Sequence, residues 1–201
     1  MRRVTSKTGF STLEMIVTTL LLALSMTVLT SGASAVSAIY RRTLAKADAQ
    51  MIYSQIETNL RAELAFADSV TVNAEKKVQT YEVNFHLCNL TLGKDGSGGP
   101  LYVRYYDARD PNTKQVQYNA DGSIAYNMDK PYYYAISPTQ QKRLEDLKVK
   151  NLPEIKYENG CFKVSGLQVE YDGQNMIANT DTPQFIIRAA NDVNEKSIAS
   201  P

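Results

Sequence analysis

The stretch 15–40 contains no Asp, Glu, Lys or Arg, and it constrains the fold of this chain more than any other feature. About 20 apolar residues suffice for a helix to cross a bilayer, so this stretch is long enough to span a membrane. Arg2, Arg3 and Lys7 precede it, and by the positive-inside tendency they keep the amino terminus in the cytoplasm. We therefore expect the rest of the chain to lie outside the cytoplasm.

A helical pattern continues beyond the apolar stretch. Apolar residues recur at multiples of four, namely Leu44, Ile52, Ile56, Leu60 and Leu64. This spacing gives a helix one apolar stripe, which another element must cover. Because neither part contains Pro, we predict one long helix over 10–67, with a membrane-spanning half and an amphipathic half. Ser31 and Gly32 mark a point midway where such a helix can bend.

After Asp68 the pattern changes to short segments rich in Val, Ile and Tyr, separated by turn residues. The strand candidates are 69–74, 79–92, 100–108, 114–119, 123–128, 131–136, 154–159, 161–172 and 184–190. Asn159-Gly160 is the strongest hairpin signal, Asp121-Gly122 is a second turn, and a short helix is expected from Ser137. We predict an α+β fold in which the long helix packs on a mostly antiparallel β-sheet domain over 68–201.

The opening stretch GFSTLEM, followed by the apolar run, resembles the class III signal of type IV pilins and pseudopilins. The resemblance implies a pilin-like fold. It also implies that a prepilin peptidase removes a leader over 1–9, cuts between Gly9 and Phe10, and methylates the new terminal amine of Phe10. The product is expected in the membrane as a single-pass protein before assembly, and afterwards at the cell surface in an extracellular filament or pseudopilus.

The same resemblance implies a structural subunit and not an enzyme: a minor pilin or a pseudopilin that requires no cofactor. Its partners would be other pilin-like subunits, the prepilin peptidase, and an inner-membrane platform protein with its assembly ATPase. The filament would serve adhesion, motility, type II secretion or DNA uptake. The sequence does not distinguish among these four functions of the filament.

Glu14 stands at the front edge of the apolar run. A carboxylate at the edge of hydrocarbon costs a few kcal/mol unless it is paired, so a partner is implied. In pilin-like proteins the corresponding carboxylate meets the terminal amine of a neighbouring subunit, here that of Phe10, and low-dielectric surroundings strengthen such a pair. We therefore assign Glu14 a role in assembly.

Cys88 and Cys161 both lie in the part expected outside the cytoplasm, where an oxidising compartment favours pairing. A bridge that closes a loop of about 70 residues would contribute on the order of 4 kcal/mol. We predict a disulfide between them, and the alternative is two unpaired thiols.

Two other routes compete with the pilin-like one. Ala33-Ser34-Ala35 forms a small-residue cleavage pattern after a basic start and an apolar stretch, as in an ordinary signal peptide. Cleavage there would release a secreted β-domain binding protein that starts at Val36. An uncleaved signal anchor would instead hold the same domain at the membrane. In the signal-peptide route Glu14 would interrupt the apolar region to no purpose.

Catalysis and metal binding have little support in the sequence. His86 and Cys88 fall on one face of a predicted strand, but no visible motif supplies a third, orienting group. Oxygen donors of the type that calcium uses occur in two loops, at Asp95, Asp107, Asp110 and Asn112. Because these residue types are also common in turns and their spacing matches no EF-hand, we predict no metal site.

Tyrosines cluster in the segments 104–109 and 130–136, beside Arg and Lys. Such rings can stack on bases or sugars. Removal of the leader leaves more acidic than basic side chains, so no electrostatic attraction supports nucleic-acid binding, which we do not expect. Alternation along a strand would instead bury about half of these rings.

Overall fold

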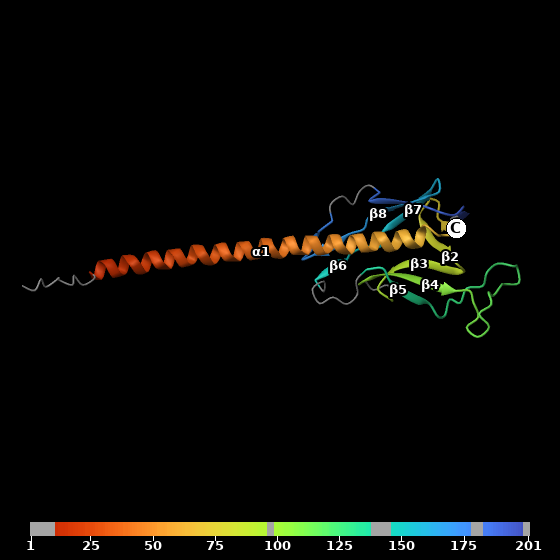
Figure 1. Ribbon diagram of the computed structural model, residues 1–201, viewed down its shortest axis with the longest axis horizontal. Helices are drawn as coiled ribbons and strands as arrows, with labels where there is room; N and C mark the ends of the chain where they lie inside the picture. The colour runs from red at the N-terminus through yellow and green to blue at the C-terminus, as the bar shows by residue number, and fades with distance from the viewer. Residues whose placement is uncertain (1–10, 96–98, 138–145, 178–182, 199–201) are drawn as a thin grey trace, which may run out of the picture. The chain divides into compact units, whose positions relative to one another are not determined.

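The structure is a computed structural model that describes residues 11–95, 99–137, 146–177 and 183–198 (Figure 1). Its elements are α1 (Thr12–Leu64), β1 (Ser69–Val72), β2 (Val78–Val83), β3 (His86–Leu92), β4 (Leu101–Asp107), β5 (Tyr132–Ala135), β6 (Leu147–Val149), β7 (Glu154–Glu158), β8 (Cys161–Ser165), β9 (Val169–Tyr171), β10 (Gln174–Asn175), β11 (Phe185–Arg188) and β12 (Asn194–Ser197). The chain forms two compact units, of which one ends at Leu44 and the other begins at Ala45.

The first unit contains the apolar part of α1. Ser11 precedes the helix, and its hydroxyl accepts a hydrogen bond from the Leu13 N–H at 3.3 Å, as an N-cap residue does. The helix continues without interruption through Ser31 and Gly32, so the structure contains no break at that point. Hydroxyl groups within this part donate back to helix carbonyls, for example from Thr27 to Ala23 at 2.9 Å. These bonds satisfy the polar groups that the apolar run carries.

In the second unit, the remaining part of α1 buries one stripe. Its buried residues are Ala45, Asp48, Ala49, Ile52, Ile56, Leu60 and Leu64. Of the five residues named for the predicted stripe, Ile52, Ile56, Leu60 and Leu64 are buried, and Leu44 is only partly buried. Ala45, Asp48 and Ala49 complete the buried stripe. The stripe packs into one core with side chains from most of the strands, among them Tyr81, Leu101 and Phe162.

The strands form three sheets. A six-stranded sheet has the order β12-β1-β2-β3-β4-β5, and two three-stranded sheets have the orders β11-β8-β7 and β10-β9-β6. All pairs are antiparallel except β1 with β12. The long helix on a mostly antiparallel β-sheet domain makes this an α+β fold, as predicted.

Turn geometry confirms some predictions and corrects others. Asn159 and Gly160 have φ values of 52° and 73° and join β7 to β8 as the predicted two-residue hairpin. The candidate strand 79–92 is wrong as a single strand, because Asn84 and Phe85, with φ values of 48° and 64°, fold it into a second hairpin. The candidate 161–172 is likewise divided, at Gly166 with φ 74°.

Two candidate strands do not form. The segments 114–119 and 123–128 contribute only the isolated bridges Arg109↔Val116 and Tyr118↔Ile124. The turn expected between them is present, with Gly122 at φ 82° and its N–H donating to Asn119. Of the helix predicted from Ser137, residues 138–145 lie outside the described ranges, and the segment that follows is β6.

Candidate functional site

The apolar part of α1 is the feature that most clearly requires a partner. Every described residue before Leu44 is exposed, and the large apolar side chains from Leu13 to Tyr40 are between 50% and 71% exposed. Full burial of one such side chain stabilises by about 1.5–3 kcal/mol. The 18-residue window of highest hydropathy averages 1.9 and is 0% buried. By length and composition α1 is therefore able to cross a membrane.

Glu14 lies in the first turn of this helix. No described residue pairs with its carboxylate, and its backbone carbonyl accepts a hydrogen bond from the Thr18 hydroxyl. Ser11 at the N-cap and Glu14 three positions later also have the spacing of a capping box, in which the carboxylate reaches back to the N-cap N–H. In the described structure the Glu14 carboxylate does not make this bond, so the capping box is indicated only by the spacing of the tetrapeptide STLE.

The helix also places charges at both ends of the apolar run. Arg41 and Arg42 follow it and are exposed. The separation of Glu14 from Arg41 corresponds to about 40 Å at 1.5 Å per residue. This matches the thickness of a bilayer with its headgroup regions, about 40–45 Å.

Gly9 and Phe10, the residues of the predicted cleavage and methylation site, lie outside the described residues. Of the proposed assembly elements, the structure describes Glu14 and the apolar helix that follows it.

Cys88 and Cys161 are both free, so the predicted disulfide is not formed. The two residues lie on β3 and β8, in different sheets, and Cys88 is completely buried. Burial, with the nearby charge of Glu63, raises the pKa of the Cys88 thiol far above its usual range. A thiol in such surroundings stays protonated and unreactive.

This environment also removes the support for a His86–Cys88 nucleophile. The Nδ1 atom of His86 lies 3.0 Å from the carbonyl oxygen of Asn84, and its Nε2 atom lies 3.8 Å from Oδ1 of Asp107. Cys88 donates only a weak hydrogen bond, at 3.5 Å, to the backbone carbonyl of His86. The imidazole therefore makes local contacts and does not activate the thiol.

Two of the oxygen donors, Asp107 and Asp110, accept hydrogen bonds from backbone groups of their own loop. Asp110 Oδ1 accepts from the N–H groups of Asn112 and Thr113, both at 2.8 Å, and these bonds lower the pKa of its carboxyl group. Asp107 Oδ1 accepts from the Arg109 N–H at 2.9 Å. Within the described ranges, no group of three or more His, Cys, Asp or Glu side chains is arranged to hold a metal ion.

The tyrosine clusters lie on β4 and the edge strand β5. Tyr132 and Tyr134 are more than half exposed, and β5 has a neighbour strand on one side only. On the opposite face, the Arg104 guanidinium lies 5.4 Å from the centre of the Tyr133 ring and donates to the Tyr106 hydroxyl at 3.3 Å. None of these rings is fully buried, so the expectation that alternation buries half of them is wrong.

No family model, curated protein or solved structure matches this chain. The arguments for its function therefore rest on its own residues and their geometry.

Proposed function

We propose that this protein is a type IV pilin-like structural subunit, a minor pilin or pseudopilin, that assembles into a filament through the apolar part of α1. One observation carries the proposal: a helix whose apolar side chains are at least half exposed over 13–40 continues without a break into the stripe that is buried in the β-rich unit. Such a helix needs lipid around it before assembly and needs other apolar helices around it afterwards.

Glu14 supplies the polar element of the assembly. The pairing we propose joins its carboxylate to the terminal amine of Phe10 in a neighbouring subunit. Because no described residue pairs with this carboxylate, a partner subunit meets no competing ion pair. A buried carboxylate left unpaired would cost several kcal/mol. The pairing therefore favours the one alignment of neighbouring helices in which Glu14 of one subunit meets the terminal amine of the next.

The proposal needs processing between Gly9 and Phe10. The test is to determine the amino-terminal sequence and the intact mass of the protein recovered from membranes and from a sheared surface fraction. We expect a start at Phe10 with the added mass of one methyl group. The variant Gly9→Val should retain the leader and remain in the membrane fraction.

Two outcomes would contradict the proposal. A start at Val36 would identify an ordinary signal peptide and a secreted β-domain. A retained Met1 in both fractions, with no assembled material, would identify a plain membrane anchor.

A further inference from the structure

A β-bulge changes the path of β2. Thr71 of β1 pairs with Thr80, but the next residue, Val72, pairs with Val78, so Gln79 is an extra residue on β2. A bulge bends its strand and disrupts pairing, and bulges are common next to functional sites.

The consequence is seen on the other side of β2. Its ladder with β3 runs from Val83↔His86 only as far as Tyr81↔Cys88, whereas β3 continues to Leu92 in its ladder with β4. Beyond Cys88, the edge of β3 that faces β2 therefore has no ladder partner among the described strands.

The direction of the backbone groups along this edge follows from alternation. The N–H of Gly93 donates to the carbonyl of Pro100, and the N–H of Ala108 donates to that of Phe85. Odd-numbered residues of β3 thus direct their backbone groups toward β4, and even-numbered ones direct theirs toward β2. The N–H and C=O of Leu90 point into the space that β2 has left.

The start of β2 crosses instead to β7. Lys77 forms an isolated bridge with Lys156, and the Tyr157 N–H donates to the carbonyl of Lys76 at 3.0 Å. A pocket of about 350 Å³ lies between β2, β3 and the start of β7, within the about 300–1,000 Å³ that is usual for binding pockets.

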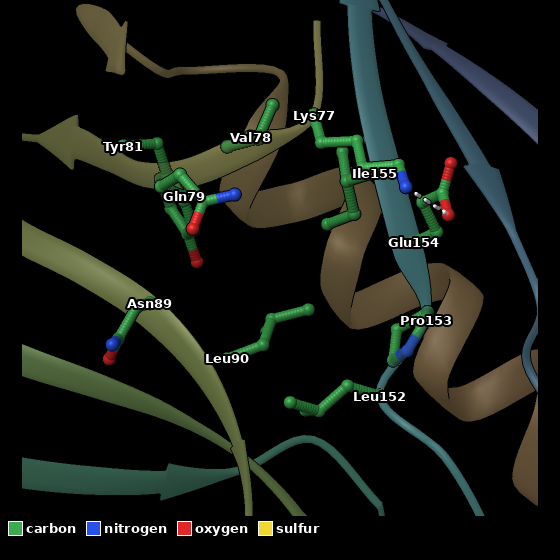
Figure 2. Close-up of a pocket in the computed structure, with 10 residues that line it drawn as sticks. All are labelled: Lys77, Val78, Gln79, Tyr81, Asn89, Leu90, Leu152, Pro153, Glu154 and Ile155. Atoms are coloured by element: carbon green, nitrogen blue, oxygen red, sulfur yellow. Dashed lines mark ion pairs between the residues drawn. The ribbon is translucent and has the colours of Figure 1, made fainter. Parts of the chain in front are cut away.

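Polar and apolar atoms contribute almost equally to the walls of this pocket, and the apolar side chains gather at its centre. Figure 2 shows Leu90, Leu152, Pro153 and Ile155 around its centre, with Asn89 directed to the opposite side of β3. At its margin, Lys77 and Glu154 form an ion pair at 3.3 Å and neutralise each other.

Tyr81 is one of the residues around the pocket. Its side chain is buried, and its hydroxyl has no hydrogen-bond partner in the described structure. A buried hydroxyl without a partner costs about 1–3 kcal/mol. Because most buried polar groups in native proteins have a hydrogen-bond partner, an unpaired hydroxyl of this kind calls for a structural or functional explanation.

We propose that this pocket binds an extended segment of another polypeptide chain. The segment pairs its main chain with the free edge of β3 at Leu90 and inserts one apolar side chain between Leu90, Leu152 and Ile155. An extended peptide offers main-chain donors and acceptors at strand spacing beside an apolar side chain, which is the combination that this edge and these walls require. The neutral margin favours an uncharged segment. The inference is independent of the proposed function of α1.

The probe for this site is the blocked pentapeptide acetyl-Thr-Val-Leu-Val-Thr-amide, added to the full chain in lipid nanodiscs with ¹⁵N-labelled leucine. We expect a saturable shift of the Leu90 amide signal and at least tenfold slower hydrogen exchange at that amide. The same peptide with its central amides N-methylated cannot pair its main chain and should bind at least tenfold more weakly. Equal binding of both peptides, or no saturable shift at Leu90, would overturn the proposal.

A matched pair of variants tests the apolar walls. Leu152 is 47% exposed, so Leu152→Asp should fold and should weaken peptide binding at least tenfold. Met128 is 56% exposed and lies outside the pocket, so Met128→Asp should bind the peptide as the unchanged protein does. If both variants bind equally well, the peptide is held elsewhere or partitions into lipid, and the pocket is not its site.

Discussion

The hydroxyl group of Tyr105 on β4 donates a 2.5 Å hydrogen bond to Oε1 of Glu63, in the last turn of α1. This bond joins the amphipathic part of the helix to the six-stranded sheet, at the strand next to the edge strand β5. Burial raises the pKa of Tyr105, and the hydrogen bond to Glu63 raises it further. The phenol therefore remains a donor throughout the physiological range of pH.

Removal of this hydroxyl should destabilise the β-rich unit. Tyr105→Phe leaves the half-buried Glu63 without its donor, and the loss of a hydrogen bond to a charged group costs about 1.5–3 kcal/mol. The measurement is urea denaturation of the full chain in detergent, followed by near-ultraviolet circular dichroism. Tyr132, the residue opposite Tyr105 on β5, is 63% exposed, so Tyr132→Phe is the matched control and should change the free energy of unfolding by less than about 0.5 kcal/mol.

Acid should weaken the attachment of β12. Glu82 accepts a hydrogen bond from the Ser69 hydroxyl at 2.6 Å and another from the Lys196 ammonium at 3.1 Å. Burial raises the pKa of Glu82, but these bonds outweigh it and the pKa lies below its ordinary value of 4.5.

The sign of the effect follows from that direction. A lowered pKa in the folded state stabilises the protein above pH 4.5, and this contribution is lost as the pH falls through the folded pKa. Glu82→Gln should therefore unfold more easily than the unchanged protein at pH 7, and the difference should shrink below pH 4.5. A constant difference across this range, measured by denaturation at each pH, would show that Glu82 does not stabilise the fold through its charge.

Two glycines with open space around them should respond in opposite directions to alanine. An added Cβ atom meets nothing within 4 Å at either Gly160 or Gly32. Gly160 has φ 73° in the β7–β8 hairpin, so Gly160→Ala should destabilise by about 1 kcal/mol or more. Gly32 is helical, so Gly32→Ala should strengthen α1 locally by about 0.5–1 kcal/mol. Denaturation measures the first effect, and hydrogen exchange around residue 32 measures the second.

Some parts of the fold could be predicted from local sequence patterns, and others could not. The part of the stripe from Ile52 to Leu64 and the Asn159-Gly160 hairpin are local patterns, and both were predicted correctly. The hairpin at Asn84-Phe85 was missed because phenylalanine is not a usual residue of a turn with positive φ.

Other features depend on contacts between distant segments. The strand β12 has the sequence NEKS, all four of its residues are exposed, and it shows no apolar alternation. Its place beside β1 is supported by ion pairs of Glu195 with Lys76 and of Lys196 with Glu82. The extra residue Gln79, which opens the pocket, is defined only by the register of two strands. No local sequence pattern predicts the position of β12 beside β1 or the extra residue Gln79 in β2.

The two cysteines should differ in reactivity. Cys161 is half-buried at the start of β8, whereas Cys88 is completely buried. A maleimide reagent should label Cys161 in the folded protein within minutes and should label Cys88 only after denaturation. Mass spectrometry counts the labels. If neither thiol reacts until a reductant is added to the denatured protein, the two cysteines are joined by a disulfide, and the difference in reactivity predicted here is wrong.

Glu14 has two possible roles, and two substitutions distinguish them. At the N3 position of a capping box that begins with Ser11, it can be replaced by glutamine, which accepts the same N-cap hydrogen bond without a charge. As the partner of the Phe10 terminal amine, it cannot, because the pair requires the carboxylate. Under the assembly proposal, Glu14→Gln and Glu14→Ala should insert and lose the leader normally, and both should be at least tenfold depleted from the sheared surface fraction. If Glu14→Gln assembles normally while Glu14→Ala does not, Glu14 acts by capping α1 and the electrostatic account of assembly is wrong.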